Sequence, residues 1–200
     1  MTHLTYIKKI GAEIATVFDD LAQLRIEVFK AFPYLYEGSI DYEKEYLKVY
    51  SSSENAMLFA VYDADKMVGA TTCIPLIDET AEVQEPFIQA QIDIQSVFYF
   101  GESILLSAYR GLGIGHRFFD EREAHARSFK QCKLTSFCAV VRPENHPLKP
   151  ADYQPLSQFW QKRGYTQTPL LKSQFDWLDI GETQSTKKEM IYWTKEISNQ

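Results

Sequence analysis

The residues best suited to chemistry lie in one turn, Arg110-Gly111-Leu112-Gly113-Ile114-Gly115, which follows an apolar run. Because glycine has no side chain, glycines at this spacing let backbone N–H groups converge on a small anion. If a helix begins here, the free N–H groups of its first turn and its dipole also favour negative charge. Arg110 adds a charged donor beside them. The turn therefore predicts a phosphate-binding site.

Two other phosphate-binding motifs fit this turn less well. The dinucleotide fingerprint GxGxxG would start at Gly111 and Gly113, but His116 stands where its third glycine belongs. A P-loop would need Gly-Lys-Ser/Thr after the turn, and that triplet does not follow it. A dinucleotide-dependent oxidoreductase is thereby disfavoured. A glycine-rich helix start without a ligand stays open as the alternative.

Glu102 is the candidate for acid–base chemistry. It is a lone carboxylate in the apolar run 97–107, in period with Phe98 and Phe100, so it is expected to be buried. A carboxylate placed in this way can take a proton from an amine. The alternative is a structural Glu that is hydrogen-bonded at a bend after Gly101.

The cysteines and histidines indicate no further chemistry. Cys73, Cys132 and Cys138 have neither CxxC nor Cys/His spacing, which predicts no disulfide framework and no metal site. Cys138 lies in an apolar run and is expected to be an inert core residue. His116 and His125 are expected at the surface or in ion pairs.

The strand, turn and helix together resemble the acyl-CoA motif of the GNAT superfamily of N-acetyltransferases. The family signature Arg/Gln-x-x-Gly-x-Gly/Ala matches Arg110, Gly113 and Gly115. The run Trp160-Gln161-Lys162-Arg163-Gly164-Tyr165 is similar to the family's Tyr-x-x-x-Gly-Phe stretch, and the resemblance covers nearly the whole chain. It implies acetyl-CoA as the acyl donor. It also implies direct transfer of the acetyl group to an amine of a small molecule or peptide, without a metal ion.

The resemblance further implies how the donor is bound. The pantetheine arm would pair with backbone groups of the central strand, and the pyrophosphate would meet the N–H groups of residues 112–116. Family members often have a coenzyme-contacting Asn after the fifth strand, where Asn145 stands here before a longer insertion. The implied donor-binding residues are Ile104, Leu105, Leu106, Arg110, Gly111, Leu112, Gly113, Ile114, Gly115, His116 and Asn145.

The resemblance also assigns the catalytic and acceptor residues. Members often carry an acidic residue on the central strand, which makes Glu102 the implied base. The family's frequent general-acid Tyr aligns with Trp160, whose indole N–H gives up no proton at ordinary pH. Tyr153 and Tyr165 are candidates to replace it, with solvent as the alternative. The implied acceptor pocket contains Phe32, Tyr34, Tyr36 and Glu37, which would suit a cationic or aromatic amine. Because Trp160 replaces the acid, a non-catalytic acyl-CoA-binding module is the competing interpretation.

Hydrophobic periodicity predicts the elements that would position these residues. Helices are expected over 12–32, 41–50 with Asp41 as its cap, 78–95 with Pro86 in its first turn, 113–130 and 156–163. Strands are expected over 4–8, 56–62, 66–76, 97–107, 134–141 and 187–197, the second and third as a hairpin. With the resemblance, this predicts an α/β (α+β) fold. Its central sheet would be mixed, mostly antiparallel, splayed between the fourth and fifth strands and flanked by helices. The loop 142–153 is long and is expected to cover the acceptor or the coenzyme.

Length and composition bound the remaining possibilities. The 200 residues, 45% of them hydrophobic, suffice for a single domain over 1–200. The formal charge of -6 argues against a nucleic-acid partner, which needs a basic face. No stretch approaches the ~18 apolar residues of a membrane span, so no membrane partner is expected and the chain is expected to be cytoplasmic. Whether it forms a homodimer stays open.

Overall fold

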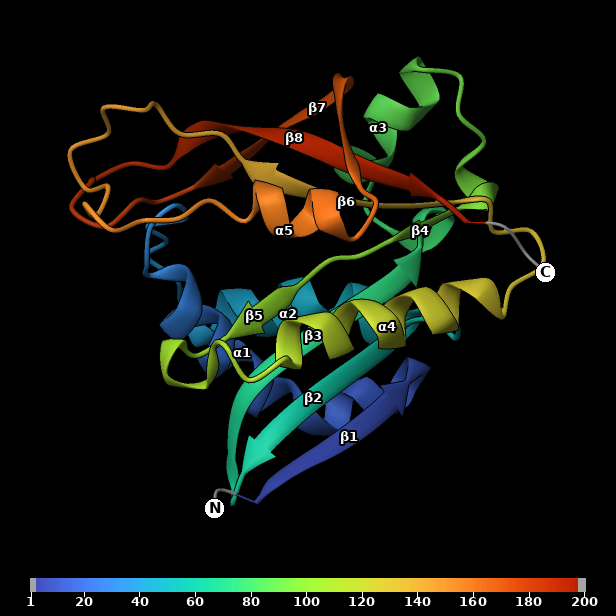
Figure 1. Ribbon diagram of the computed structural model, residues 1–200, viewed down its shortest axis with the longest axis horizontal. Coiled ribbons are helices and arrows are strands. Elements are labelled where there is room, and N and C mark those ends of the chain that lie inside the picture. The colour runs from blue at the N-terminus through green and yellow to red at the C-terminus, as the bar shows by residue number, and fades with distance from the viewer. Residues whose placement is uncertain (1–2, 198–200) are drawn as a thin grey trace.

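The computed structural model describes residues 3–197, which form one sheet with helices on both faces (Figure 1). Its strands are β1 Leu4–Ile10, β2 Met57–Asp63, β3 Lys66–Pro75, β4 Val97–Tyr99, β5 Ser103–Leu105, β6 Leu134–Val140, β7 Thr166–Trp177 and β8 Thr186–Glu196. Its α-helices are α1 Phe18–Phe29, α2 Ile40–Ser52, α3 Ala81–Gln89, α4 Ile114–Arg127 and α5 Ser157–Lys162. Short 3₁₀ helices lie at Gly11–Val17, Leu76–Asp78, Ile94–Ser96 and Ser107–Tyr109. No helix in this part of the chain is both long and apolar enough to cross a membrane.

The sheet is mixed but mostly antiparallel. Its described strands follow the order β1-β2-β3-β4-β6-β8-β7, with β5 attached to β3. Every pair is antiparallel except β4 with β6. In Figure 1, α4 and α5 lie in front of the sheet and α1 and α2 lie behind it. The predicted fold class is therefore confirmed.

Two hydrophobic cores hold these layers together, one on each face of the sheet. The core behind the sheet contains Leu21 of α1, Leu47 of α2 and Phe87 of α3. The core in front contains Ile114 and Phe118 of α4. Burial of each such side chain stabilises the fold by roughly 1.5–3 kcal/mol. The central strands are thus fixed from both sides.

The central strand is broken where the sequence predicts one continuous strand over 97–107. Ile74 of β3 pairs with Tyr99. Thr71, three residues before Ile74 on β3, pairs with Ser103, which lies four residues after Tyr99. The opposite segment therefore has one residue more than β3 between the two pairs. One extra residue of this kind is a β-bulge, and side chains beyond it change faces. β4 and β5 are therefore separate pieces, and the single-strand prediction is wrong.

Gly101 makes the break possible. A Cβ at this position would overlap the Tyr50 hydroxyl and lie 2.9 Å from Thr72 Oγ1. The carbonyl of Glu102 is then fixed by two donors of β3. These are Thr71 Oγ1 at 2.7 Å and the Thr72 N–H at 3.1 Å. The bulge is thus held by specific bonds around a position that has no room for a side chain.

The sheet opens beyond this break. β4 and β6 pair in parallel from Val97 opposite Leu134 to Tyr99 opposite Ser136. The N–H of Phe100 adds one more bond, to the Ser136 carbonyl at 2.7 Å. Among the described strands, β5 pairs with β3 alone and leaves its other edge free. The predicted splay beside the central strand is confirmed at this opening.

Two helices are shorter than the periodicity predicts. The region expected as one helix over 12–32 begins with the 3₁₀ turn Gly11–Val17, and α1 starts only at Phe18. The tighter turn suits a chain that must reverse directly after β1. α3 is shorter than the predicted 78–95, and Pro86 lies inside it instead of in its first turn. Since Pro has no N–H to donate, it limits the helix at this point.

The cap of α2 also differs from the prediction. Ser39, not Asp41, is the N-cap, because its extended backbone lets Ser39 Oγ accept from the Tyr42 N–H at 3.4 Å. Asp41 instead lies in the first turn of the helix. Its negative charge there interacts favourably with the helix dipole. The helix itself was expected and is present.

β7 is a strand that hydrophobic patterning does not predict. Its sequence is largely polar and contains Pro169. It lies at the edge of the sheet, paired with β8, and its register shifts between Thr168 and Lys172. A proline is tolerated at such a bulge on an edge strand because no ladder bond is lost. Pairing with β8 makes this segment a strand, not its own propensity.

We expect Gly101→Ala to lower the free energy of unfolding by about 1–3 kcal/mol, because the new Cβ overlaps the Tyr50 hydroxyl. Denaturant titration followed by circular dichroism measures the change. Gly115→Ala is the control, since the nearest atom to its Cβ is Phe159 Cζ at 3.7 Å, an ordinary contact. Combining Gly101→Ala with Tyr50→Phe should recover part of the loss. Equal stability of the two alanine variants would contradict the overlap.

Candidate functional site

The glycine turn lies between the end of β5 and the start of α4. Gly111 and Gly113 have φ angles of 78° and 79°, in the left-handed region that favours glycine. Cβ atoms at these two positions would meet nothing within 4 Å, so the space beside the turn is open. Gly113 is also the N-cap residue of α4, which begins at Ile114. The glycines are needed for backbone conformation and for close approach, not for packing.

Several N–H groups of this turn are available to an anion. Those of Gly111, Leu112 and Gly113 donate to no carbonyl among the described residues. The first helical positions, Ile114 and Gly115, have no acceptor one turn earlier because the helix starts there. The N–H of His116 is different, since it already donates to the Gly113 carbonyl at 3.1 Å. The N–H groups available to a phosphate are therefore those of residues 111–115, whereas the prediction placed them at 112–116.

The free edge of β5 leads directly to this turn. The Glu102 carbonyl and the Leu106 N–H both bond to β3, the latter with Val68 O at 2.9 Å. Backbone groups alternate in direction along a strand, so Ser103 and Leu105 direct theirs to the open edge. The Leu106 carbonyl also accepts from Tyr109 N–H at 3.0 Å. Of the predicted pantetheine-pairing residues, Leu105 keeps free backbone groups, whereas both groups of Leu106 are engaged.

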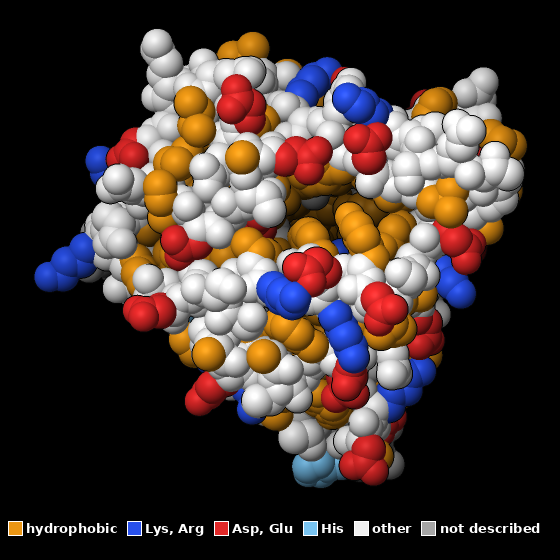
Figure 2. Space-filling view, turned by 180° about the vertical axis from the view of Figure 1, so that it is seen from behind, with side chains coloured by type: hydrophobic (Ala, Val, Ile, Leu, Met, Phe, Trp, Pro, Cys, Tyr) orange, Lys and Arg blue, Asp and Glu red, His pale blue; other side chains and the backbone are white. Residues whose placement is uncertain are grey.

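A deep hollow opens on the face behind that of Figure 1. Figure 2 shows hydrophobic side chains on its walls and acidic side chains around its mouth. It lies between the half of the molecule that carries α1 and α2 and the half that carries β7 and β8. An opening of this kind between two packed layers is where a ligand can be enclosed.

Buried charges lie on this same face of the sheet. Arg25 of α1 forms one ion pair with Glu43 of α2 and another with Glu102 beside the break. Glu102 Oε2 also accepts from Thr72 Oγ1 at 2.6 Å. Because of the bulge, Glu102 faces α1, whereas Phe100 packs in the core under α4. Glu102 is buried, as predicted, but the prediction that it lies in period with Phe100 is wrong, and its role as a base stays a prediction.

Glu79 is a third buried carboxylate on this face, and the sequence does not single it out. It follows β3 and the 3₁₀ turn, with only 6% of its surface exposed. Glu79 Oε2 accepts from the Thr80 N–H at 2.8 Å, and Oε1 accepts from the Tyr50 hydroxyl at 3.4 Å. Burial raises the pKa of this carboxyl to about 7, and the charge of Glu102 acts in the same direction. Glu79 therefore exchanges a proton near neutral pH.

The predicted acceptor residues form an aromatic segment after α1, but they do not all face one place. The Phe32 ring lies edge-on to Tyr153, with centroids 4.7 Å apart. Tyr34 contacts Phe29, with centroids 4.6 Å apart, and burial raises the pKa of its hydroxyl. Burial likewise raises the pKa of Tyr36, and the charge of the buried Glu43 adds to this effect. Glu37 is exposed, and its N–H donates to the Leu178 carbonyl at 2.8 Å.

Arg142 holds this aromatic segment in place, a role that its sequence position does not reveal. Its guanidinium pairs with both carboxylate oxygens of Asp179, at 2.7 Å and 2.9 Å. It also donates to the carbonyls of Pro33 and Tyr34, each at 2.7 Å. Asp179 in turn pairs with Lys188 of β8 at 3.2 Å. The segment after α1, the end of β6 and the β7–β8 connection are thereby tied together.

The long loop 142–153 lies beside this segment. Tyr153 contacts Phe32, and the charges of Lys149 and Arg110 act on its hydroxyl, although burial raises its pKa overall. Tyr153 is therefore within electrostatic range of the glycine turn. Asn145 is exposed on the same loop. The predictions that the loop covers a ligand and that Asn145 contacts the coenzyme stay predictions.

The remaining aromatic candidates are packing residues. Trp160 of α5 lies against Phe137 and Trp193, each with ring centroids 5.1 Å apart. Tyr165 is buried, and its hydroxyl bonds to Thr135 Oγ1 at 3.1 Å and to Glu123 Oε1 at 3.4 Å. The second candidate acid is thus held by partners inside the core under α4.

Neither Cys138 nor the two histidines acts as a nucleophile or shuttle in this arrangement. Burial raises the pKa of the Cys138 thiol to about 12, so it stays protonated, as an inert core residue would. The ring of the exposed His116 packs edge-on against Phe159, with centroids 4.9 Å apart. His125 is half-buried and donates from Nε2 to the Asn55 carbonyl at 2.8 Å. His125 is therefore partly at the surface, as predicted, and its hydrogen-bond partner is a backbone carbonyl.

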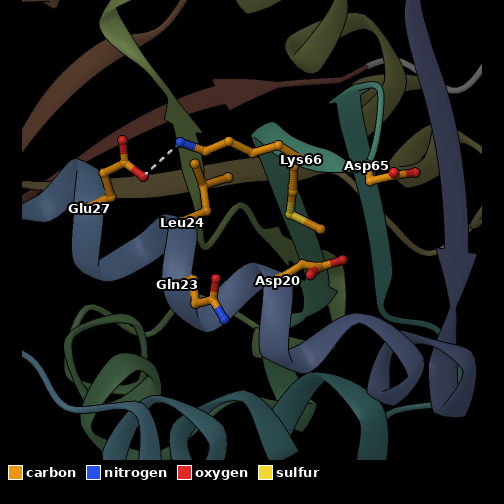
Figure 3. A pocket seen from close by; sticks show the side chains of 7 residues that line it. Asp20, Gln23, Leu24, Glu27, Asp65 and Lys66 are labelled. Atoms are coloured by element: carbon orange, nitrogen blue, oxygen red, sulfur yellow. Dashed lines mark hydrogen bonds and ion pairs between the residues drawn. The ribbon is translucent and has the colours of Figure 1, made fainter.

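A second pocket lies between α1 and the turn that joins β2 to β3 (Figure 3). Its volume is about 350 Å³, and Lys66 donates to Glu27 across it at 3.3 Å. The lining residues are Asp20, Gln23, Leu24, Glu27, Asp65, Lys66 and Met67. None of the predicted site residues is among them. Within residues 3–197, no group of three or more His, Cys, Asp and Glu side chains is placed to hold a metal ion.

We expect Glu79 to make the stability of the fold depend on pH. The pKa of its carboxyl rises from the ordinary value of 4.5 to about 7 on folding, so the folded state binds the proton more tightly. The free energy of unfolding should therefore fall as the pH rises from 4.5 to about 7, by on the order of 2 kcal/mol from this group. Denaturant titrations of wild type and Glu79→Gln between pH 4.5 and 8 measure it. The variant should lack this part of the slope.

Glu45→Gln is the matched control for this titration, because the Glu45 side chain is 72% exposed. It should leave the pH dependence of unfolding as it is in the wild type. If Glu79→Gln also follows the wild type at every pH, Glu79 is ionised in the folded protein throughout this range.

Comparison with known proteins identifies the fold. No protein-family model matches the sequence, and a search of curated proteins finds no match. Solved structures do match. NAA60 of Arabidopsis thaliana, in complex with a bisubstrate analogue, has a TM-score of 0.61 at 12% identity, over 98% of this chain and 100% of that one. A GNAT-family acetyltransferase of Streptococcus pneumoniae has a TM-score of 0.58 at 12% identity, with the same coverage. YncA of Salmonella typhimurium, with its cofactor acetyl-CoA, has a TM-score of 0.57 at 6% identity, over 98% and 95%. The chain therefore has the GNAT acetyltransferase fold.

Proposed function

We propose that this protein transfers an acetyl group from acetyl-CoA directly to an amine of a small molecule or peptide. The observation that carries the proposal is the free edge of β5, which leads into a turn with unpaired N–H groups at the start of α4. Acetyl-CoA is the natural candidate for such a site, since it has an amide-containing arm joined to a pyrophosphate. The similar structures of Salmonella YncA and of Arabidopsis NAA60 contain acetyl-CoA.

Acetyl-CoA would lie along the open edge of β5 and across the glycine turn. Ser103 and Leu105 would pair with the amide groups of the pantetheine arm, in the way that one strand adds to another. The N–H groups of residues 111–115 would meet the pyrophosphate, with the exposed Arg110 as a charged donor. Asn145 and His116 would border the donor through their side chains. The turn would then hold the pyrophosphate more through its backbone N–H groups than through its side chains.

The acceptor would enter the hollow on the opposite side of the break. Glu43, Glu79 and Glu102 contribute buried carboxylates there, and Arg25 is the cation that two of them share. This imbalance of charge favours a cationic acceptor, such as an ammonium group. The aromatic side chains Phe32, Tyr34 and Tyr36 would supply apolar walls and cation–π contacts. Glu37 is exposed and would contact only an acceptor that extends out of the hollow.

The chemistry needs one proton removed from the ammonium group and one supplied to the departing thiolate. Glu102 and Glu79 are the two carboxylates near the break that could take the proton from the ammonium group. Tyr153 would supply the proton to the thiolate, because burial raises its pKa and keeps its hydroxyl protonated.

Tyr153→Phe should then lower kcat and leave the affinity for acetyl-CoA unchanged. Unchanged turnover would assign the thiolate's proton to solvent.

A non-catalytic acyl-CoA-binding module is the second candidate, and one observation favours it. Trp160 occupies the position of the family's frequent general-acid Tyr and is packed between Phe137 and Trp193. Such a protein would bind acetyl-CoA tightly and leave it intact. Binding and turnover must therefore be measured side by side.

An assay of free thiol release tests the two functions. Purified protein with acetyl-CoA should release coenzyme A faster when an amine is added, across a panel of a polyamine, an amino acid, an aromatic alkylamine and a peptide with a free N-terminus. Mass spectrometry should find the acetylated amine. Calorimetry in the same buffer measures coenzyme binding. Tight binding without any amine-dependent release would leave the binding module as the function.

We expect Arg110→Ala and Gly113→Val each to raise the Kd for acetyl-CoA by about tenfold or more. The first removes a charged donor to the pyrophosphate. The second puts a β-branched residue at a φ of 79°, which strains the turn and moves its N–H groups. Titration calorimetry measures both.

Two control variants distinguish loss of these pyrophosphate contacts from a general loss of folded structure. Leu112→Ala removes an exposed side chain but keeps the N–H group, and Arg117→Ala removes the same charge from a guanidinium that lies 3.8 Å above the Tyr6 ring. Both should bind acetyl-CoA within about twofold of the wild type. If Arg110→Ala and Gly113→Val also bind normally, the coenzyme site is not at this turn.

A further inference from the structure

Glu79 ends a continuous line of polar side chains that crosses the core to the break in the central strand. Its neighbour is the Tyr50 hydroxyl, which donates to Glu79 Oε1 at 3.4 Å. The same hydroxyl lies directly against Gly101, and Thr72 Oγ1 lies against Gly101 from the other strand. Thr72 then bonds to Glu102 at 2.6 Å. Tyr50 therefore stands between Glu79 and the point where the sheet opens.

The two carboxylates at the ends of this line differ in their partners. Glu102 has both oxygens engaged, one with Arg25 and the other with Thr72. To bind a proton it would have to release one of these partners. Glu79 forms no ion pair with any residue of the described chain, and its bonds come from a neutral hydroxyl and a backbone N–H. Two carboxylates held in such different surroundings divide the roles of fixed charge and proton carrier.

We propose that Glu79, acting through the Tyr50 hydroxyl, accepts the proton that the acceptor ammonium group loses before acetyl transfer, while Glu102 attracts that group by its charge. The inference rests on the proposed acetyltransferase function and adds to it a positioning pair outside the predicted site. Glu79 is suited to the task because burial raises its pKa to about 7, so it is ionised in part at neutral pH and can take a proton. Burial also raises the pKa of Tyr50, which keeps the relaying hydroxyl protonated.

The proton and the bonds balance in two steps. An N–H bond of the ammonium group breaks, its proton passes to the Tyr50 oxygen, and the Tyr50 hydroxyl proton passes to Glu79. The neutral amine then forms the C–N bond at the thioester carbonyl carbon, and the C–S bond breaks. Tyr153 gives its proton to the departing sulfur, the second amine proton restores the Tyr153 hydroxyl, and coenzyme A leaves as the free thiol. Glu79 afterwards releases its proton to solvent.

Other titratable groups surround Glu79 and bear on its pH dependence. Among the titratable groups, the effect on its pKa is largest for Glu102, followed by Tyr50 and Arg25. Tyr50 and Arg25 lower its pKa, and Glu102 raises it. Further groups within electrostatic range are Tyr46 of α2, Tyr99 of β4, Cys138 of β6 and Tyr192 of β8. Burial raises the pKa of each of these four further above its ordinary value, which already lies above neutrality, so they stay uncharged between pH 5.5 and about 8 and contribute no titration of their own.

The test is the pH profile of turnover at saturating acetyl-CoA, with the most active alkylamine of the panel as acceptor. In the wild type, kcat/KM for the amine should carry an inflection near pH 7 from Glu79. Glu79→Gln should lower kcat/KM at pH 7 by about 30-fold or more and remove that inflection, so that the profile follows only the amine's own ionisation. Tyr50→Phe should give a similar loss although Glu79 is still present.

A weakly basic acceptor separates proton removal from structural damage. Hydroxylamine is already neutral at pH 7, so no ammonium proton needs an acceptor. With hydroxylamine, Glu79→Gln and Tyr50→Phe should lie within about threefold of the wild type. An equal loss with both acceptors would overturn the proposal and make Glu79 and Tyr50 structural residues.

Glu82→Gln, an exposed carboxylate on the same segment, is the matched control and should leave both profiles unchanged. Thermal melts at pH 6 confirm that each variant is folded at the assay temperature. If the wild type turns over and Glu79→Gln keeps its inflection near pH 7, only this inference fails. If the wild type transfers no acetyl group to any amine, the proposed function fails and this inference fails with it.

Discussion

The sheet is continuous as far as the bond between Phe100 and Ser136, and beyond that bond its two halves separate. One extra residue, Gly101, creates this division, because a backbone without a side chain is required beneath the Tyr50 hydroxyl. The bulge turns Glu102 to the face of α1 and leaves the outer edge of β5 unpaired. Without the bulge, the strand would continue to pair with β6, the sheet would stay closed beside β5, and Glu102 would point towards α4. Both the open edge of β5 and the buried position of Glu102 depend on this one residue.

The charges that gather behind the break couple the proposed site to the stability of the fold. Arg25 joins α1 to Glu43 of α2 and to Glu102 beside β5, so removal of Arg25 would leave two carboxylates in the core without the cation that they share. Glu79 belongs to the same group of side chains but has no cation beside it in the described structure. Burial and the charge of Glu102 raise the pKa of its carboxyl, and the protein gives up some stability near neutral pH to keep an ionisable carboxyl there.

The divided sheet also needs a connection at its open end, and Arg142 supplies it. Its guanidinium bonds to Asp179 and to two carbonyls of the aromatic segment, so the segment after α1 is fixed to the β7–β8 pair. Backbone bonds between the two segments add to this tie, including Ile180 N–H to Leu35 O at 2.7 Å. A planar guanidinium suits this task because its donors can serve a carboxylate and neighbouring carbonyls at once. The aromatic walls of the hollow thereby gain fixed positions.

Local features of the chain were predictable from the sequence because their causes are local. A positive φ favours glycine, so the glycine pattern at Gly111 and Gly113 indicates an anion-binding turn before any fold is known. The hairpin of β2 and β3 and the amphipathic helix α4 follow in the same way from periodicity, to within a few residues, whereas α1 starts six residues later than predicted. The family resemblance added that the sheet is mixed, mostly antiparallel and splayed between the fourth and fifth strands.

Only the tertiary structure decided which side chains meet. Arg25 and Glu102 are 77 positions apart, and no local pattern links them. The face that Glu102 occupies depends on a bulge that is fixed by Tyr50 and by β3, so counting along the strand gives the wrong side. β7 is a strand because β8 lies beside it, although its own residues are polar. Glu79 looks like an ordinary surface glutamate in the sequence, and only its enclosure between α2 and the sheet changes its chemistry. Periodicity depends only on the residues of one segment and predicts its local conformation. Strand pairing and burial depend on other segments, distant in the sequence, that pack against it.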